Sequence, residues 1–500
     1  MKALCLALWI SIMVVEGAAP LFDAVRNHDH PRLKGLLEAG ADPNDLQPDG
    51  STALHQAALD GDSISVEYLL QAHANVTAIN RYGVSALWLA CRNGDGSMAK
   101  QLLAAGADPD ARQVGGQTPL MAAARSGSLE AVRALHERGA DLDDQEDRGQ
   151  TALMWAAAHG HAEVVSWMVG QGADFRQSLQ GGFTPFAFAI REGKMDVVRV
   201  LLEAGVDVNE TMSPEKRNGR SVPRGMTPLL MAVENGHFEM AIALVEAGAR
   251  PNDTSAGYAA LHAISWVRKP DHGEGVNGMP PPDTTGSLTS LDFVHQLVEL
   301  GAEVNLPHPK AGAGLGALNK TGATPFLLAA RTADLPLLKR LHALGADPSI
   351  LTVDRVTPLI AAAGLGTLAA GEVAGTEPEV LEVIDWLISI GEDINAVDAN
   401  GETAMHAAAY KNLPKVVTFL ADHGARIDIW NQPDKHGWTP LLIAEGFRPG
   451  NFKPSFETID AIHQVMVASG LTPPPLTNQD GVNNSDFGPR NLKYQGVPNP

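Results

Sequence analysis

Three histidines share one position in a recurring four-residue motif, and they are the residues whose type best suits a metal. His55, His262 and His406 close the motifs Thr-Ala-Leu-His, Ala-Ala-Leu-His and Thr-Ala-Met-His. A zinc site needs several donor atoms that converge on one ion, each about 2.0–2.3 Å away. These histidines belong to separate, mostly non-adjacent copies of the motif. The sequence therefore predicts neither a metal site nor a cofactor.

The short signatures of common enzyme classes are missing from the sequence. It contains no Gly-x-Ser-x-Gly, no His-Glu-x-x-His and no Gly-x-x-x-x-Gly-Lys-Ser/Thr. Gly312-x-Gly314-x-Gly316 matches a dinucleotide loop only in part, because the final glycine spacing and a following helix are lacking. We predict no catalytic residue. An enzyme stays open as an alternative only if folding brings together loop residues, namely Asp271, His272, Glu274, Asp283 and His308.

The elements that carry these residues follow a repeat. The motif begins at residues 52, 85, 118, 151 and 184, which are 33 residues apart, and continues less regularly at 227, 259, 324, 357, 403 and 439. A Gly-Ala or similar pair closes each unit in the same register, from Gly40-Ala41 onward. Together the two markers count about twelve units. The first unit lacks the Thr-Pro-Leu element, as a terminal repeat often does.

Each unit can be interpreted as two helices. Thr caps the first helix, and Pro or Ala follows at a position where a missing N–H costs little. Leu and the Ala-Ala pair face the core. The second helix, such as 162–169 or 196–202, ends at Gly in the left-handed conformation. His73 replaces that Gly once, and His tolerates positive φ.

These residues resemble the ankyrin repeat, whose signature is Thr-Pro-Leu-His-x-Ala at a period of about 33. The resemblance covers roughly residues 20–470. It implies an all-α ankyrin-repeat solenoid of about twelve helix-turn-helix units with connecting turns. It also implies that the motif histidine makes local hydrogen bonds that fix the turn, rather than binding a ligand.

The domain organisation follows from the breaks in the pattern. Residues 1–17 have a basic start, an apolar core and small residues at the end, which predicts a signal peptide on an exported, bacterial member of the family. Its removal leaves Cys91 as the one cysteine, so no disulfide is expected. The repeat array spans 18–470, and 471–500 is a Pro/Gly-rich tail. Insertions are predicted near 210–225, 269–287, 306–322, 364–377 and 446–455.

The resemblance also implies a concave face formed by turn tips and first helices, where a partner would bind. The residues just after the Ala-Ala pair should look onto that face. They include four arginines in phase, which suit an acidic or carboxylate-rich partner, although arginine is also an ordinary solvated residue there. The candidate partner-binding residues are Arg92, Arg125, Arg191, Arg331 and Tyr410, followed near the turn tips by Arg81, Tyr82 and Arg148.

The charge of the chain limits the possible partners. A formal net charge of −21 repels nucleic acid, and no apolar run after the signal peptide could span a membrane. We therefore expect a protein-binding scaffold that is not an enzyme, exported to the periplasm or outside the cell. An exported effector that binds a foreign host protein is the alternative with the same array.

Overall fold

The computed structural model describes residues 20–214, 222–269, 282, 284–309, 318–368, 370, 374–448 and 453–477. In these residues the regular structure is helical, and β-pairing is limited to two isolated bridges, Ile79 with Ser85 and Gln145 with Thr151. The predicted all-α class is confirmed. Apart from the short α23 (Ile427–Trp430), the described helices form twelve consecutive pairs. None of them is long and apolar enough to cross a lipid bilayer.

The chain divides into two compact units. Unit 1 comprises Met1–Asp207 with Pro214–Ser221, and unit 2 comprises Val208–Ser213 with Val222–Pro500. Unit 1 contains α1 to α12 and unit 2 contains α13 to α25. The repeat pattern alone treats both as one continuous array.

Unit 1 consists of six helix pairs. The first helices are α1 (Pro20–Arg26), α3 (Ala53–Asp60), α5 (Ala86–Arg92), α7 (Pro119–Ser126), α9 (Ala152–His159) and α11 (Pro185–Arg191). The second helices are α2 (His30–Glu38), α4 (Ser63–Gln71), α6 (Gly96–Ala104), α8 (Leu129–Glu137), α10 (Ala162–Gly170) and α12 (Met195–Glu203).

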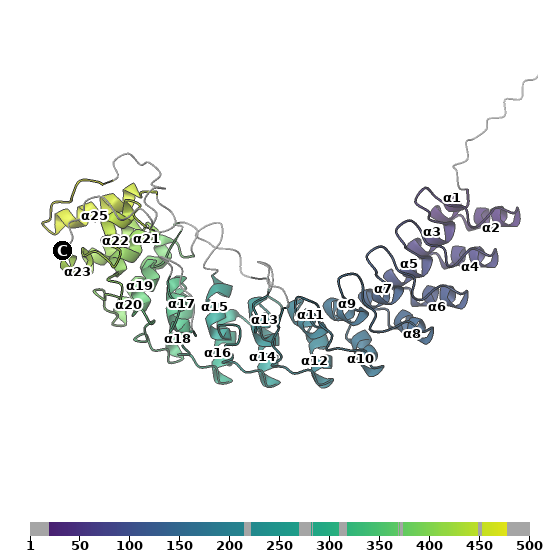
Figure 1. Cartoon of the computed structure of the whole chain (residues 1–500), viewed down its shortest axis with the longest axis horizontal. Helices are drawn as coiled ribbons and strands as arrows, with labels where there is room; N and C mark the ends of the chain where they lie inside the picture. The colour runs from purple at the N-terminus through teal and green to yellow at the C-terminus, as the bar shows by residue number, and fades with distance from the viewer. Residues whose placement is uncertain are drawn as a thin grey trace, which may run out of the picture. The chain divides into compact units, whose positions relative to one another are not determined.

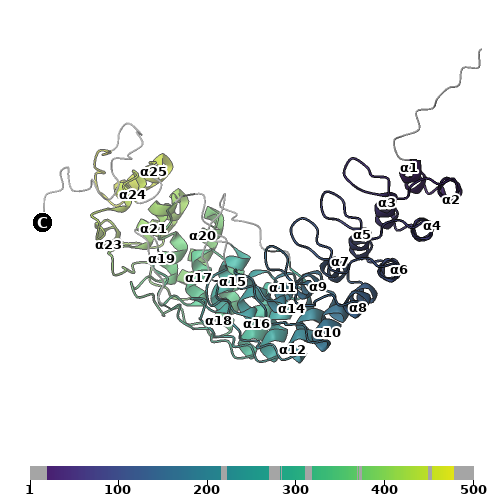
Figure 2. The same ribbon diagram turned by 45° about the vertical axis from the view of Figure 1, so that its right-hand side comes forward.

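The first helices of unit 1 pack on one another in sequence order, from α1 on α3 to α9 on α11 (Figure 1). The second helices form a parallel row, and the loops between pairs extend past the first helices (Figure 2). Small side chains permit this close packing: Ala57, Ala90, Ala123 and Ala156 are completely buried. The buried motif leucines fill the remaining core, and burial of each contributes about 1.5–3 kcal/mol.

The predicted caps form. The hydroxyl of Thr118 accepts a hydrogen bond from the backbone N–H of Met121 at 3.3 Å, and Thr151 does the same for Met154 at 3.3 Å. Gly106 closes α6 at φ +96°, and His73 takes the corresponding place after α4 at φ 63°. His73 therefore serves as the predicted substitute for glycine.

Unit 2 has six further pairs and the extra helix α23. Its first helices are α13 (Pro228–Glu234), α15 (Ala260–Arg268), α17 (Pro325–Arg331), α19 (Pro358–Ala363), α21 (Ala404–Lys411) and α24 (Pro440–Ala444). Its second helices are α14 (Phe238–Glu246), α16 (Ser290–Glu299), α18 (Leu335–Ala343), α20 (Glu377–Ser389), α22 (Pro414–Asp422) and α25 (Phe456–Ala468).

Longer connections separate the helices within three pairs of unit 2. They join α15 to α16, α19 to α20 and α24 to α25. Part of each predicted insertion, all of residues 1–17, where the signal peptide is predicted, and the tail from 478 onward lie outside the described residues. At the start of the tail, the backbone N–H of Thr477 donates to buried Glu445 at 2.8 Å.

Candidate functional site

Three of the predicted arginines occupy equivalent places on unit 1. Arg92, Arg125 and Arg191 each lie seven residues after the residue that caps their helix, in the last turn of α5, α7 and α11. All three are exposed. A cation in the last turn of a helix also interacts favourably with the helix dipole. Since successive first helices pack side by side, these arginines lie on one surface, which we call the first-helix surface.

Each of these arginines covers an aromatic ring. The guanidinium carbon of Arg92 lies 5.7 Å from the centre of the Trp88 ring, and that of Arg125 lies 5.1 Å from the Trp155 ring. Arg191 lies 5.0 Å from Phe183 and 5.1 Å from Phe188. A guanidinium that rests on a ring keeps its planar N–H edge available for an acceptor. The rings thus limit the orientations that these arginines can take.

The repeat that contains α9 interrupts the row of arginines. Ala158 stands where the neighbouring repeats have arginine, and the ring of Trp155 lies under Arg125 of the preceding repeat. Trp155 is half-buried, and its ring is 5.9 Å from the exposed His159. The first-helix surface therefore combines cationic and aromatic groups, which are the residue types enriched at protein interfaces.

The arginines of the first-helix surface differ in whether a carboxylate of the chain already pairs with them. Arg191 is paired with Glu192 at 2.8 Å. Among the described residues, Arg92 and Arg125 have no carboxylate within ion-pair distance. Arg92 and Arg125 are consequently the two positions best prepared to receive an external carboxylate.

The three candidates near the turn tips are exposed as well. The Arg81 guanidinium rests 5.1 Å from the ring of its neighbour Tyr82, which is 50% exposed. The backbone N–H of Arg148 donates to Glu146 at 2.9 Å, and its side chain is at the surface. These residues widen the exposed area but do not by themselves identify a ligand.

Arg331 differs from the other arginines. It belongs to unit 2, is half-buried, and donates from Nη1 to the backbone carbonyl of Leu365 at 3.3 Å. This bond connects α17 to the turn that follows α19. Arg331 therefore stabilises contacts within unit 2, a role that the repeat position alone did not indicate.

The prediction that Tyr410 faces a partner is wrong for this structure. Tyr410 is only 2% exposed. Its helix α21 packs against α24, and the buried Arg448 donates to the Tyr410 carbonyl. Burial, together with nearby Glu402 and Asp434, raises the pKa of the Tyr410 hydroxyl far above its usual value. The helix pair added at the C-terminal side covers this position.

The motif histidines have the local role that the resemblance implied. Nδ1 of His55 accepts from the backbone N–H of Thr52 at 3.2 Å, and its Nε2 donates to the Val84 carbonyl at 3.0 Å. The corresponding Nε2 donations of His262 and His406 reach Leu306 at 2.9 Å and Gln432 at 3.0 Å. Burial lowers the pKa of both His262 and His406 to about 4, so they stay neutral at physiological pH.

A second cluster, which consists of two histidines and an aspartate, was not predicted from the sequence. His28, His30 and Asp62 have donor atoms that all lie within 4.8 Å of one another. The signal was available in the repeat register, because His28 lies 33 residues before Gly61. Glycine is the usual residue at this left-handed position, whereas His28 takes it with φ 51°.

Most of the loop residues that an enzyme site would need lie outside the part of the chain that the structure describes. Asp271, His272, Glu274 and Asp283 lie outside the described residues. His308 is described and is 8% exposed, with its ring edge against His262 at 5.2 Å between centroids. His308 thus packs beside a motif histidine.

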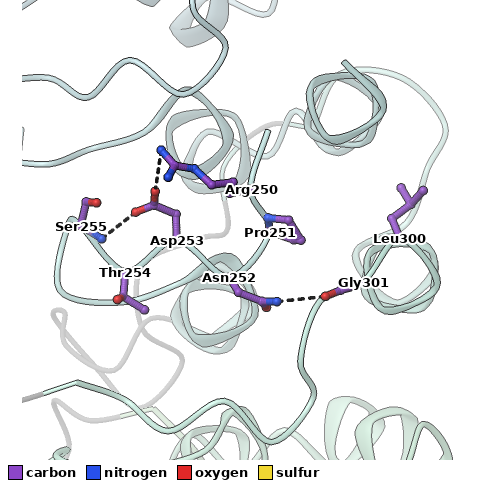
Figure 3. Close-up of a pocket in the computed structure, with 8 residues that line it drawn as sticks. All are labelled: Arg250, Pro251, Asn252, Asp253, Thr254, Ser255, Leu300 and Gly301. Carbon is purple, nitrogen blue, oxygen red and sulfur yellow. Dashed lines mark hydrogen bonds and ion pairs between the residues drawn. The ribbon is translucent and has the colours of Figure 1, made fainter. Parts of the chain in front are cut away.

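A shallow hollow of about 640 Å³ lies between the turn after α14 and the end of α16 (Figure 3). The side chains of Asn252, Arg250 and Asp253 in its lining already have partners within the chain. Asn252 donates to the Gly301 carbonyl at 2.9 Å and accepts from the N–H of Glu303 at 2.8 Å, while Arg250 pairs with Asp253 at 3.6 Å. Asn209 of unit 2 makes the same two kinds of bond, to the Gly248 carbonyl at 3.0 Å and from the N–H of Arg250 at 2.9 Å. The hollow therefore forms around a structural clamp between repeats.

Comparison with known proteins points to one family. The sequence model for ankyrin repeats, three copies long, matches residues 21–113, 89–178, 120–212, 165–255 and 373–451. A putative ankyrin repeat protein of fowlpox virus (strain NVSL) is 50% identical over 50 residues, which are 10% of this chain and 12% of that protein.

Two further proteins are similar to parts of the chain at lower sequence identity. Human neurogenic locus notch homolog protein 1 is 32% identical over 147 residues, which cover 25% of this chain and 6% of that protein. The chain thus spans about an eighth or less of the length of these curated relatives. The crystal structure of the human ASB11 ankyrin repeat domain matches 47% of this chain and 99% of its own at 23% identity, with a TM-score of 0.40.

Proposed function

Because the chain belongs to the ankyrin-repeat family, whose arrays are generally protein-interaction scaffolds, we propose that it binds an acidic protein segment through the first-helix surface of unit 1. One observation carries this proposal. Arg92 and Arg125 are exposed, rest on the rings of Trp88 and Trp155, and have no carboxylate partner among the described residues.

The chemistry of a guanidinium on a ring suits a carboxylate-bearing partner. The ring holds the flat side chain in place, so less conformational entropy is lost when its N–H groups bind both oxygens of a carboxylate. The aromatic rings add apolar contact area beside the charge. Since the chain as a whole is acidic, with a net charge of −21, such a partner must be recognised through this local surface rather than by long-range attraction.

A pair of double variants tests the site. Arg92→Glu/Arg125→Glu reverses two charges on the first-helix surface. Arg133→Glu/Arg199→Glu makes the same charge change on the second helices α8 and α12, where Arg133 also lies over a ring, that of Trp167, at 5.9 Å. Proteins captured from the native source by each variant are quantified by mass spectrometry.

We expect one acidic protein to be recovered by the parent and the control, and to fall at least about tenfold with Arg92→Glu/Arg125→Glu. Two desolvated charge contacts of about 1–2 kcal/mol each would give that loss. Equal recovery by both double variants would place the partner on another surface. No specific capture by the parent would refute the scaffold itself.

We also propose that the scaffold is exported to the periplasm or the extracellular space, on the basis of the signal pattern in residues 1–17. Terminal sequencing of the protein from fractionated cells checks this. A new N-terminus near residue 18 in the periplasm or medium is expected. Release into the medium would favour the effector alternative, and an intact N-terminus in the cytoplasm would contradict export.

A further inference from the structure

Two imidazoles, His28 in the loop between α1 and α2 and His30 at the first position of α2, lie beside the carboxylate of Asp62, which caps α4. Nδ1 of His28 lies 3.2 Å from Oδ2 of Asp62, and Nε2 of His30 lies 2.9 Å from the same oxygen. The two histidines belong to the first repeat of unit 1, whereas Asp62 caps the second helix of the next repeat.

We propose that His28, His30 and Asp62 bind a divalent first-row transition metal of the Zn²⁺ type, which clips the first repeat to the second. Two imidazole nitrogens and one carboxylate oxygen bind such ions better than Mg²⁺ or Ca²⁺, which prefer oxygen ligands only. This site goes beyond the proposed partner surface and does not depend on it.

The spacing of the donor atoms fits such an ion. Zinc binds imidazole nitrogen at about 2.0–2.1 Å and carboxylate oxygen at about 2.0–2.2 Å, so adjacent ligands in tetrahedral or octahedral geometry lie roughly 2.9–3.4 Å apart. The nitrogens of His28 and His30 lie 3.2 and 2.9 Å from Oδ2 of Asp62. All three donor atoms are within 4.8 Å of each other. An ion can therefore be accommodated by small side-chain rotations.

Asp62 is held in place for this role. Its side chain is 5% exposed and accepts from the backbone N–H of Ser65 at 3.1 Å and the Ser65 hydroxyl at 2.6 Å. These two bonds hold the carboxylate in position before any metal arrives.

The histidines provide access from solvent. Their side chains are 56% exposed for His28 and 30% for His30. The backbone also departs from the repeat here, because His28 accepts a left-handed φ of 51° where the next unit has Gly61. Three protein ligands leave further coordination positions open on the exposed side, to be filled by water.

Titration of the full chain with Zn²⁺ tests the proposal, with calorimetry at pH 7.5 and the visible spectrum of bound Co²⁺ as readouts. His28→Gly is the decisive variant, because it installs the usual glycine and relieves the left-handed strain, so the fold is retained. His73→Gly is the matched control, since His73 is an exposed histidine with positive φ, at 63°, outside the cluster.

We expect one Zn²⁺ per chain with micromolar or tighter affinity in the parent and in His73→Gly, and at least about tenfold weaker binding in His28→Gly and Asp62→Asn. Asparagine is itself a good N-cap, so Asp62→Asn keeps the helix start while removing the ligand charge. Zn²⁺ should also raise the melting temperature of the parent but not of His28→Gly. No one-to-one binding by the parent, or equal binding by His28→Gly, would overturn the site.

Discussion

Unit 1 and unit 2 use the same helix pair but place their charges differently. In unit 1 the arginines of the first helices lie at the surface, over aromatic rings, and the motif repeats every 33 residues. In unit 2 several ionisable side chains are inside: Asp334, His406 and Arg448 are 2% exposed or less, Lys411 is 4% exposed and Glu402 is 8% exposed.

Charged side chains of unit 2, some buried and some partly exposed, connect repeats that are separated by longer segments. Arg268 at the end of α15 donates to Asp334 at the start of α18 with bonds of 2.7 and 3.0 Å. Lys269 pairs with Glu379 at 2.5 Å, and Nζ of Lys411 donates to the Ala374 carbonyl at 2.6 Å. Where insertions interrupt the regular turns, these polar contacts therefore supplement the apolar packing of unit 2.

The largest expected effect comes from breaking the Arg268–Asp334 pair. Arg268→Met leaves the fully buried Asp334 without its cation, and an uncompensated buried charge costs about 3–5 kcal/mol. Arg199→Met is the unit 1 control, because Arg199 and Asp196 are 65% and 77% exposed and such pairs contribute about 0–1 kcal/mol. Urea denaturation should show a large shift only for Arg268→Met. Equal shifts would remove the contrast between the units.

A smaller and pH-dependent effect is expected at Glu402. Burial, with Asp398 and Asp434 nearby, raises its pKa from 4.5 to about 8. The folded state then holds a proton that the unfolded state loses, so stability is complete below pH 4.5 and decreases as pH rises toward 8.

Gln precedes the motif threonine at Gln117 and Gln150 of unit 1, which makes Glu402→Gln the natural comparison. This variant should be more stable than the parent by about 1–2 kcal/mol at pH 8 and indistinguishable at pH 4. Denaturation midpoints across this range check it, and a constant difference at both pH values would contradict it.

Lys411 should show the opposite sign. Burial, followed by the nearby charges of Arg331 and Lys269, lowers its pKa from 10.5 to about 7. Between pH 10.5 and 7 the Lys411 amine is protonated in the unfolded chain but neutral in the folded chain. The free energy of unfolding therefore falls as pH decreases through that range.

Lys411→Met removes this cost and keeps the volume of the side chain. The variant should gain about 1 kcal/mol over the parent at pH 6, allowing for the lost bond to Ala374, and the gain should vanish near pH 10. Melting curves at both pH values test this. A gain that grows with pH would disprove the lowered pKa.

The smallest effect is expected in unit 1. Arg125→Ala removes an exposed cation from the Trp155 ring and should cost only about 0.5–1 kcal/mol. The tryptophan fluorescence should change because the Arg125 guanidinium no longer lies over the Trp155 ring, while the melting temperature stays nearly constant. A loss comparable with that of Arg268→Met would show that this arginine is structural.

The sequence by itself determined the repeat register, the helix pairs, their caps and the glycine substitute His73. The resemblance to the ankyrin repeat added the hydrogen-bonding role of His55. These features depend on contacts within about one repeat, so residue type and spacing are enough to specify them. The exposure of Arg92, Arg125 and Arg191 followed from the same register.

Only the tertiary structure decided the remaining features. Tyr410 is buried because α24 packs on α21, and Arg331 is half-buried beside the turn after α19. The cluster of His28, His30 and Asp62 forms because a left-handed residue in one repeat turns its side chain toward the cap of the next. The division into two units likewise appears only in the packing. Each of these features depends on contacts between repeats. The motif of a single repeat does not show which other residues will pack against it and bury its side chains.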